Sequence, residues 1–204
     1  MQIGPRYKKA RYLGAPIFRK TQTQKFAFRS QKKNKNKKRG RRGGKSEYGR
    51  QMLEMQKARF NYGVSSGQFG NYVKKALVTK GDNAKNLLGA LEGRLDNTIL
   101  RAGFAPTRAA ARQLAAHGHF RINGISVSIP SFKVKVGDKI TIRAGSMNKA
   151  VFSKLEEELK NTQWPSWLKV DLEKKEVEIV GEPGVADQSE LLFDIRSVLE
   201  FYTR

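Results

Sequence analysis

The sequence contains no cysteine among its 204 residues. Disulfides and thiolate metal sites are therefore excluded, and the composition is typical of a reducing compartment. Only two histidines are present, His117 and His119, and no carboxylate lies near them in the sequence. Two isolated imidazoles make a poor metal site, so we expect neither a metal nor a cofactor.

Long apolar segments are also missing. No stretch approaches the ~20 apolar residues that span a bilayer, and the first residues lack the apolar core of a secretory signal. The basic segments show no apolar face that would hold them on a membrane surface. We therefore expect a cytoplasmic protein with no membrane partner.

Acidic residues are absent from the first 45 positions, which hold 17 Lys and Arg. The remaining positions hold 24 Lys and Arg against 18 Asp and Glu, a net of +6 within a total of +23. A basic arm joined to a body of modest charge is typical of a nucleic-acid-binding protein. A solubilising or localising tail is the alternative.

The basic arm divides into two parts. Residues 1–28 mix aromatic rings with cations, which suits either base stacking or packing onto the body. Residues 29–45 have too few apolar side chains to offset the entropy of ordering, so we expect disorder until RNA binds. Their ten cations are candidate RNA contacts: Arg29, Lys32, Lys33, Lys35, Lys37, Lys38, Arg39, Arg41, Arg42 and Lys45.

Three short helices are expected between residues 46 and 90. Ser46 caps the first, Gly63 ends it, and an apolar stripe including Met55 and Tyr62 marks its core face. A last helix from Leu191, preceded by a capping pattern at Asp187 and Glu190, carries apolar residues on one face. We expect it to pack back on the first three helices.

Residues 91–142 combine two helices with a hairpin. The four-residue spacing of Leu91, Leu95 and Ile99 predicts one amphipathic helix that Gly103 ends. Thr107 is placed to cap a second helix, in which Ala111 and Leu114 point inward while Arg108 and Arg112 share an exposed flank.

Strands follow these helices. Alternating residues on both sides of Asn123-Gly124, from Phe120 to Ile122 and from Ile125 to Ile129, predict a tight hairpin. Further strands are expected at 139–143, 168–172 and 176–179, the last two extending the sheet. Between the strands at 139–143 and 168–172, residues 151–161 are expected to form a helix with Val151, Leu155 and Leu159 inward.

Several motifs in this region resemble the RNA-binding module of the ribosomal S-four family. They are Leu91-Glu-Gly-Arg-Leu-Asp-Asn, Thr107-Arg108 with Arg112-Gln113-Leu114, and Ile122-Asn123-Gly124. Flanking segments, among them Lys45-Ser-Glu-Tyr-Gly49, Tyr62-Gly63-Val64 and Phe201-Tyr-Thr-Arg204, are similar to the family's amino-terminal domain and chain ends. Ala110 departs from the family's usual Glu, and the cysteine-bound zinc of some members has no counterpart here.

The resemblance implies an α+β fold. A small helical domain at 46–90, completed by 188–204, would contain the inserted module with its sheet extension at 91–187, behind a basic arm at 1–45. It further implies 16S-type rRNA as partner, early assembly of the small subunit, contact with ribosomal protein S-five in translational accuracy, and a position near the mRNA entry channel. Besides the arm, the RNA-binding candidates are Tyr48, Arg50, Lys57, Arg59, Tyr62, Arg94, Arg108, Arg112, Gln113, His117, His119, Arg121 and Asn123.

No set of nucleophile, base and orienting group is visible, so we expect a non-enzyme. Asp96 follows a Gly-Arg-Leu pattern like that of a pseudouridine synthase, but no segment remains for a catalytic domain. Asp96 is expected to pair with Arg94, Arg101 or a helix end. The two rival functions are an RNA-modifying enzyme and a free RNA-binding factor of the ribosome-rescue type.

Overall fold

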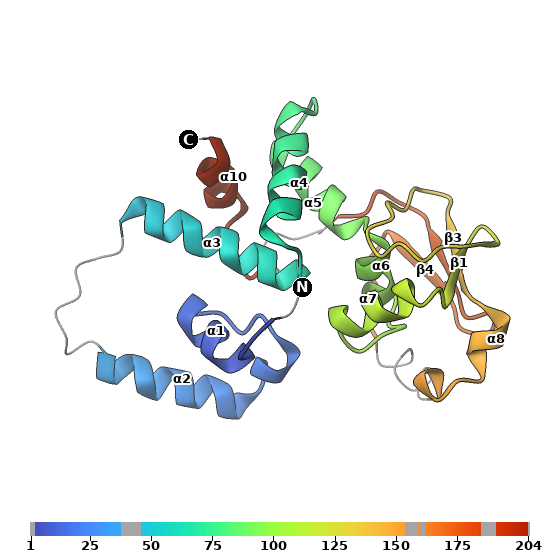
Figure 1. The fold of residues 1–204 in the computed structure, drawn as a ribbon, viewed down its shortest axis with the longest axis horizontal. Coiled ribbons are helices and arrows are strands. Elements are labelled where there is room, and N and C mark those ends of the chain that lie inside the picture. Colours follow the sequence, from blue (N-terminus) through green and yellow to red (C-terminus); the bar gives the residue numbers. More distant parts are fainter. Residues whose placement is uncertain (1–2, 38–45, 154–158, 160–161, 185–190, 204) are drawn as a thin grey trace. The chain divides into compact units, whose positions relative to one another are not determined.

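The computed structural model describes residues 3–37, 46–153, 159, 162–184 and 191–203, with residues 31–37 described by their backbone alone. Two compact units divide the chain (Figure 1). Unit 1 combines Met1–Val78 with Asp187–Arg204, and unit 2 is Thr79–Ala186. The module is thus an insertion in a helical domain, and the α+β fold class is confirmed.

Unit 1 is helical. Its longest helix, α3 (Glu47–Tyr62), begins where the Ser46 hydroxyl accepts a hydrogen bond from the Gly49 N–H at 3.2 Å, and it ends at Gly63 with φ of 63°. Both predicted helix boundaries are therefore confirmed. The other elements are α1 (Arg6–Leu13), η1 (Arg19–Thr21), α2 (Gln24–Lys37), α4 (Ser66–Val78) and α10 (Ile195–Thr203).

Helix α10 packs against α3, as predicted. The Gln51 amide donates to Glu200 at 3.0 Å, and the rings of Tyr48 and Phe201 lie 5.5 Å apart. The helix begins at Ile195 and not at Leu191, because the Asp194 carboxylate accepts from the Arg196 N–H and serves as the first cap. The capping pattern expected at 187–190 lies outside the described residues.

Residues near the amino terminus contribute to the core of unit 1. Leu13 and Ile17 are buried in one cluster with Leu53 of α3. These two side chains are 4% and 6% exposed. Of the two roles left open for residues 1–28, base stacking or packing onto the body, Leu13 and Ile17 therefore have the second.

The expected disorder of residues 29–45 was wrong for residues 29–37, which belong to α2. Helix α2 contains neither Gly nor Pro and is rich in Lys and Gln, which are good helix formers. Charge and low hydropathy alone therefore gave the wrong expectation. Residues 38–45 lie outside the described part of the chain.

Unit 2 begins with three helices, α5 (Asn83–Glu92), α6 (Leu95–Arg101) and α7 (Arg108–Ala116). The single helix predicted over Leu91 to Ile99 was wrong, because Gly93 ends α5 and Arg94 forms a β-bridge with Lys133. The other predictions are confirmed. Gly103 has φ of 87° just after α6, and the Thr107 hydroxyl accepts from the Ala110 N–H at the start of α7.

A five-stranded antiparallel sheet follows, in the order β2-β1-β3-β5-β4. One face packs on α6 and α7 through residues such as Phe120, Ile140 and Val177, which are at most 1% exposed. The predicted turn at Asn123-Gly124 is confirmed, with positive φ at both residues. The strands are β1 (Phe120–Ile122), β2 (Ile125–Ser126), β3 (Lys139–Ile142), β4 (Leu168–Asp171) and β5 (Glu176–Ile179).

Two local predictions in unit 2 were wrong. The strand expected over Ile125 to Ile129 extends only over Ile125–Ser126, both exposed. Val151 is 63% exposed because Ala150–Phe152 forms a 3-10 turn, η2, that turns Phe152 into the core instead. A short helix, α8 (Ala144–Met147), precedes that turn. In the described part of the chain, no helix is long and apolar enough to cross a membrane.

Candidate nucleic-acid interface

The two helices α6 and α7 pack side by side through their apolar faces. Leu95 and Ile99 of α6 and Ala111 and Leu114 of α7 are buried in the core of unit 2, as predicted for α7. This packing fixes both helix backbones, so the polar residues between them are also held in place. Four arginines and two carboxylates meet there.

Asp96 is the first of these carboxylates. Its side chain is 5% exposed and lies between two arginines. Arg94 donates to both carboxylate oxygens at 2.9 and 2.8 Å, and Arg112 donates to Oδ2 at 2.9 and 2.8 Å. The expected pair with Arg94 is confirmed, and Arg112 was not foreseen as a second partner. Asp96 thus links the start of α6 to the middle of α7.

Glu92 is the second carboxylate, and its side chain is fully buried. It accepts from the Asn97 amide at 2.6 Å and from Arg101 at 3.0 and 3.2 Å. The Asn97 oxygen in turn accepts from Arg108 Nε at 3.1 Å. A chain of hydrogen bonds therefore joins Arg101 to Arg108 through a buried acid.

We call Glu92, Arg94, Asp96, Asn97, Arg101, Arg108 and Arg112 the arginine cluster. Its four guanidinium groups outnumber its two carboxylates, which leaves a net charge of +2. The side chains of Arg101 and Arg112 are 32% and 27% exposed, whereas that of Arg94 is 3% exposed. The cluster thus exposes a surplus of positive charge on guanidinium groups that hydrogen bonds to Glu92 and Asp96 already hold in place.

The predicted site residues of unit 2 do not all belong to this cluster. Gln113 and His117 are exposed on or beside α7, close in sequence to Arg112. Arg121 is exposed in β1, whose neighbours Phe120 and Ile122 are buried, so it lies on the sheet face opposite the core. Asn123 is exposed in the hairpin turn, where its side chain bonds Asp138 and the Lys139 N–H at 2.9 Å.

Two of the predicted RNA contacts in unit 2 have buried side chains. Arg94 is 3% exposed against Asp96, and His119 is 8% exposed. The Nδ1 atom of His119 lies 2.9 Å from the Ser146 hydroxyl. Burial lowers the pKa of His119 below its ordinary value, and the nearby charges of Lys149, His117 and Arg143 add to this effect. The lowered pKa favours the neutral imidazole at neutral pH.

The candidates in unit 1 also separate by exposure. Arg29, Tyr48 and Arg50 are exposed. Lys57 is bound to Glu54 at 2.6 Å, and the guanidinium of Arg59 lies 4.7 Å from the Phe60 ring centre. Tyr62, another predicted contact, is 2% exposed and packs against Phe193. Lys32, Lys33, Lys35 and Lys37 lie in α2 without described side chains, and Lys38, Arg39, Arg41, Arg42 and Lys45 lie outside the described residues.

Arg101 belongs to the arginine cluster, but the sequence prediction did not include it among the RNA-binding candidates. It lies seven residues after Arg94, a spacing that returns to nearly the same side of a helix, and this spacing was the available signal. Across the described segments, no group of three or more His, Cys, Asp or Glu is placed to hold a metal ion. The chemistry that this site offers is recognition of anions by fixed guanidinium groups.

Comparison with known proteins gives two family matches. Residues 93–140 match the family described as S4 domain, and residues 2–92 match the family described as Ribosomal protein S4/S9 N-terminal domain. Three similar relatives are each named small ribosomal subunit protein uS4. The relative from Syntrophomonas wolfei is 43% identical over 81% of this chain and 78% of its own length. Those from Mycobacterium marinum and Pseudothermotoga lettingae are 42% and 37% identical over 78% and 81% of this chain, and each is covered over 79% of its length.

Proposed function

Because the chain belongs to the bacterial-type family of small ribosomal subunit protein uS4, we propose that it is a structural component of the small subunit that binds 16S-type rRNA. The observation that carries the proposal is the arginine cluster on α6 and α7. Its exposed guanidinium groups are fixed by buried acids before any RNA arrives. Binding then costs less side-chain entropy than the ordering of free lysines would.

The mechanism is positional. Arg101, Arg108 and Arg112 neutralise phosphates along one edge of unit 2, and the bound counterions of the RNA are released. Gln113 and His117 supply further donors beside the same helix. Guanidinium groups suit this task because their planar donors match phosphate oxygens in a bidentate arrangement. Shape and backbone contacts of this kind are typical of structured RNA recognition.

The basic segment supplies a second contact. Helix α2 carries Arg29 and the lysines at 32, 33, 35 and 37, and no acidic residue precedes Glu47 in the sequence. A continuous positive charge of this kind suits a phosphate backbone. We further propose that rRNA binding by both parts begins assembly of the subunit body, and that the protein contacts ribosomal protein S-five and lies near the mRNA entry channel.

Filter binding to 16S rRNA across a salt series tests the main proposal. Arg108→Ala and Arg112→Ala should each weaken binding by about 1 kcal/mol and lower the salt slope by about one phosphate. Lys174→Ala is the matched control, because it removes an exposed cation beside Asp171 and Glu173 in the β4–β5 turn. If the control variant loses as much affinity and slope as the cluster variants, the assignment of the interface fails.

The contribution of α2 is tested separately. Replacing Lys32, Lys33, Lys35 and Lys37 by Gln keeps a good helix former at each position while it removes the charges. The salt slope should fall by about 0.7–0.9 for each phosphate contact that is lost. An unchanged slope would mean that α2 faces a protein or solvent.

The two rival functions receive no support from these observations. Both family matches together account for residues 2–140, and the relatives are named as ribosomal proteins, not as enzymes. A high-salt wash distinguishes a structural component from a free factor. A structural component should sediment with small subunits after the wash, whereas a factor should appear in the supernatant.

A further inference from the structure

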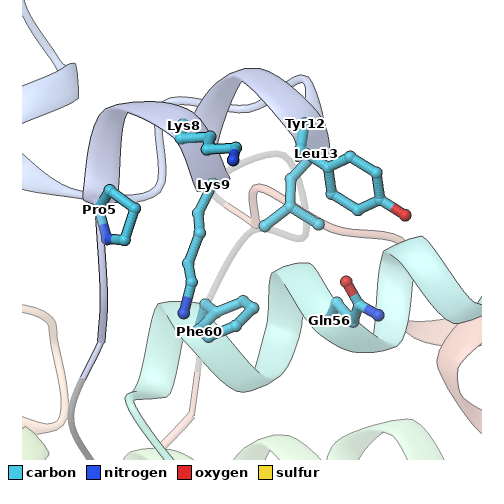
Figure 2. A pocket seen from close by; sticks show the side chains of 7 residues that line it. All are labelled: Pro5, Lys8, Lys9, Tyr12, Leu13, Gln56 and Phe60. Carbon is cyan, nitrogen blue, oxygen red and sulfur yellow. The ribbon is translucent and has the colours of Figure 1, made fainter.

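A groove lies between α1 and α3 within unit 1 (Figure 2). Its volume is about 380 Å³, which falls within the range of small-molecule sites, ~300–1,000 Å³. Helix α1 contributes Lys8, Lys9 and Tyr12, and helix α3 contributes Gln56 and Phe60. The buried side chain of Leu13 forms part of its apolar lining. Base stacking was one of the two roles that the sequence left open for residues 1–28, to which Tyr12 belongs.

The two aromatic side chains of the groove present surface to an incoming group. Tyr12 is 60% exposed, and Figure 2 shows its ring projecting beyond Leu13 at one end of the groove. Phe60 is half-buried, and the ammonium group of Lys9 lies 4.6 Å from its ring centre. A flat apolar group entering here would meet aromatic surface and a positive charge together.

The polar groups of the groove favour one kind of occupant. Lys8 is exposed, and no acidic residue occurs before Glu47, so the α1 side of the groove is positive throughout. The Gln56 amide has no hydrogen-bond partner among the described residues, which leaves both donor and acceptor for a ligand. A nucleotide combines the three features that this lining would recognise: a flat ring, a polar base edge and a phosphate.

We propose that this groove binds one unpaired nucleotide of a single-stranded RNA segment. The base stacks on the exposed ring of Tyr12, the Gln56 amide bonds the base edge, and Lys8 contacts a flanking phosphate. Phe60, whose ring already carries the Lys9 ammonium, forms the apolar floor of the groove. This assignment rests on the proposed rRNA binding and adds recognition of a base to the recognition of backbone phosphates. The arginine cluster holds backbone phosphates, whereas the groove distinguishes an unstacked base from a base within a helix.

The test uses the full chain and a single-stranded RNA oligonucleotide that carries one 2-aminopurine, compared with the same oligonucleotide in a duplex. Tyr12→Ala should weaken binding of the single strand at least fivefold and reduce the quenching of 2-aminopurine by stacking. The salt slope should stay unchanged, because no phosphate contact is lost. Lys8→Ala should instead lower the slope by about 0.7.

Tyr7→Ala is the matched control. Tyr7 lies on the same helix, is 50% exposed and has its ring centre 5.9 Å from that of Phe26, but it does not line the groove. Gln56→Ala should weaken binding of the single strand, whereas Gln68→Ala, at a half-buried glutamine of α4 outside the groove, should not. Thermal unfolding of each variant confirms that the fold is kept.

The outcomes separate the groove from the proposed function. If Tyr12→Ala and Tyr7→Ala weaken binding equally, or if the duplex is affected as much as the single strand, the groove assignment is overturned while rRNA binding stands. If small-subunit proteins freed of RNA bind the wild type and not Tyr12→Ala, and RNA affinity is unchanged, the occupant is a protein segment and the assignment is also overturned. Failure of the wild type to bind any rRNA would overturn both proposals.

Discussion

Removal of the Asp96 carboxylate gives a quantitative test of the arginine cluster. Asp96→Ala takes away the group that accepts two hydrogen bonds from Arg94, whose side chain is only 3% exposed. Loss of one partner from a buried ion pair costs about 3–5 kcal/mol, because the remaining charge stays in a poorly solvated place. We therefore expect the free energy of unfolding of unit 2 to fall by about that amount.

The opposite deletion should cost much less. Arg112→Ala also removes two hydrogen bonds to Asp96, but Arg112 is 27% exposed and Asp96 keeps its bonds to Arg94. Partly exposed pairs contribute about 0.2–1 kcal/mol, so we expect a loss near 1 kcal/mol. The informative quantity is the ratio of the two losses in free energy of unfolding, that of Asp96→Ala to that of Arg112→Ala. We expect this ratio because Arg94 is buried and Arg112 is partly exposed.

Urea unfolding followed by tryptophan fluorescence measures both changes. The only tryptophans, Trp164 and Trp167, belong to unit 2, so their emission reports that unit. Glu173→Ala removes an exposed carboxylate of the same unit and should change the free energy by less than about 0.5 kcal/mol. If Asp96→Ala costs no more than Arg112→Ala, the cluster is not held by a buried acid, and our account of its rigidity is wrong.

Three further predictions concern stability. The pKa of His119 in the folded protein lies below the ordinary 6.5, so at pH values below 6.5 the unfolded chain binds more protons than the folded chain. The free energy of unfolding should therefore decrease as the pH falls below 6.5, by at most about 1.4 kcal/mol per pH unit. His119→Asn should flatten this pH dependence in urea titrations. Leu13→Ala should destabilise unit 1 by about 2–4 kcal/mol, seen as a lower thermal midpoint of the helical signal, whereas the exposed Tyr12→Ala should have little effect. Thr107→Ala should cost about 1 kcal/mol in tryptophan-detected unfolding, and Thr107→Ser should restore it, because the hydroxyl caps α7.

Elements with a local cause could be predicted from the sequence. The Thr107 cap, the stop at Gly103 and the turn at Asn123-Gly124 each depend on a few neighbouring residues, and all three occur where expected. The helical form of residues 29–37 also has a local cause, but the prediction weighed charge and neglected helix propensity. The packing of α10 on α3 was predictable because both helices carry an apolar face that needs a partner.

Other features depend on contacts that the sequence does not reveal. Arg94 is buried because the β-bridge to Lys133 and the carboxylate of Asp96 enclose it, and neither is visible as a local pattern. His119 lies in a polar turn of the sequence, yet Ser146 and Phe152 cover it from later elements. Arginine and histidine side chains near a motif are therefore candidates for contact or for burial alike, and only tertiary structure decides between them.

The pairing of α3 with α10 has a consequence for synthesis of the chain. Unit 2, Thr79–Ala186, comprises 108 residues that the ribosome must translate between the two helices. At ~5–20 residues per second this takes roughly 5–20 s. During that interval the nascent chain presents the apolar face of α3 without its partner helix α10. The inserted unit has all of its own residues as soon as Ala186 is added, before α10 is made. Chaperones and proteases can therefore recognise a prematurely terminated chain, even though its RNA-binding module is already complete.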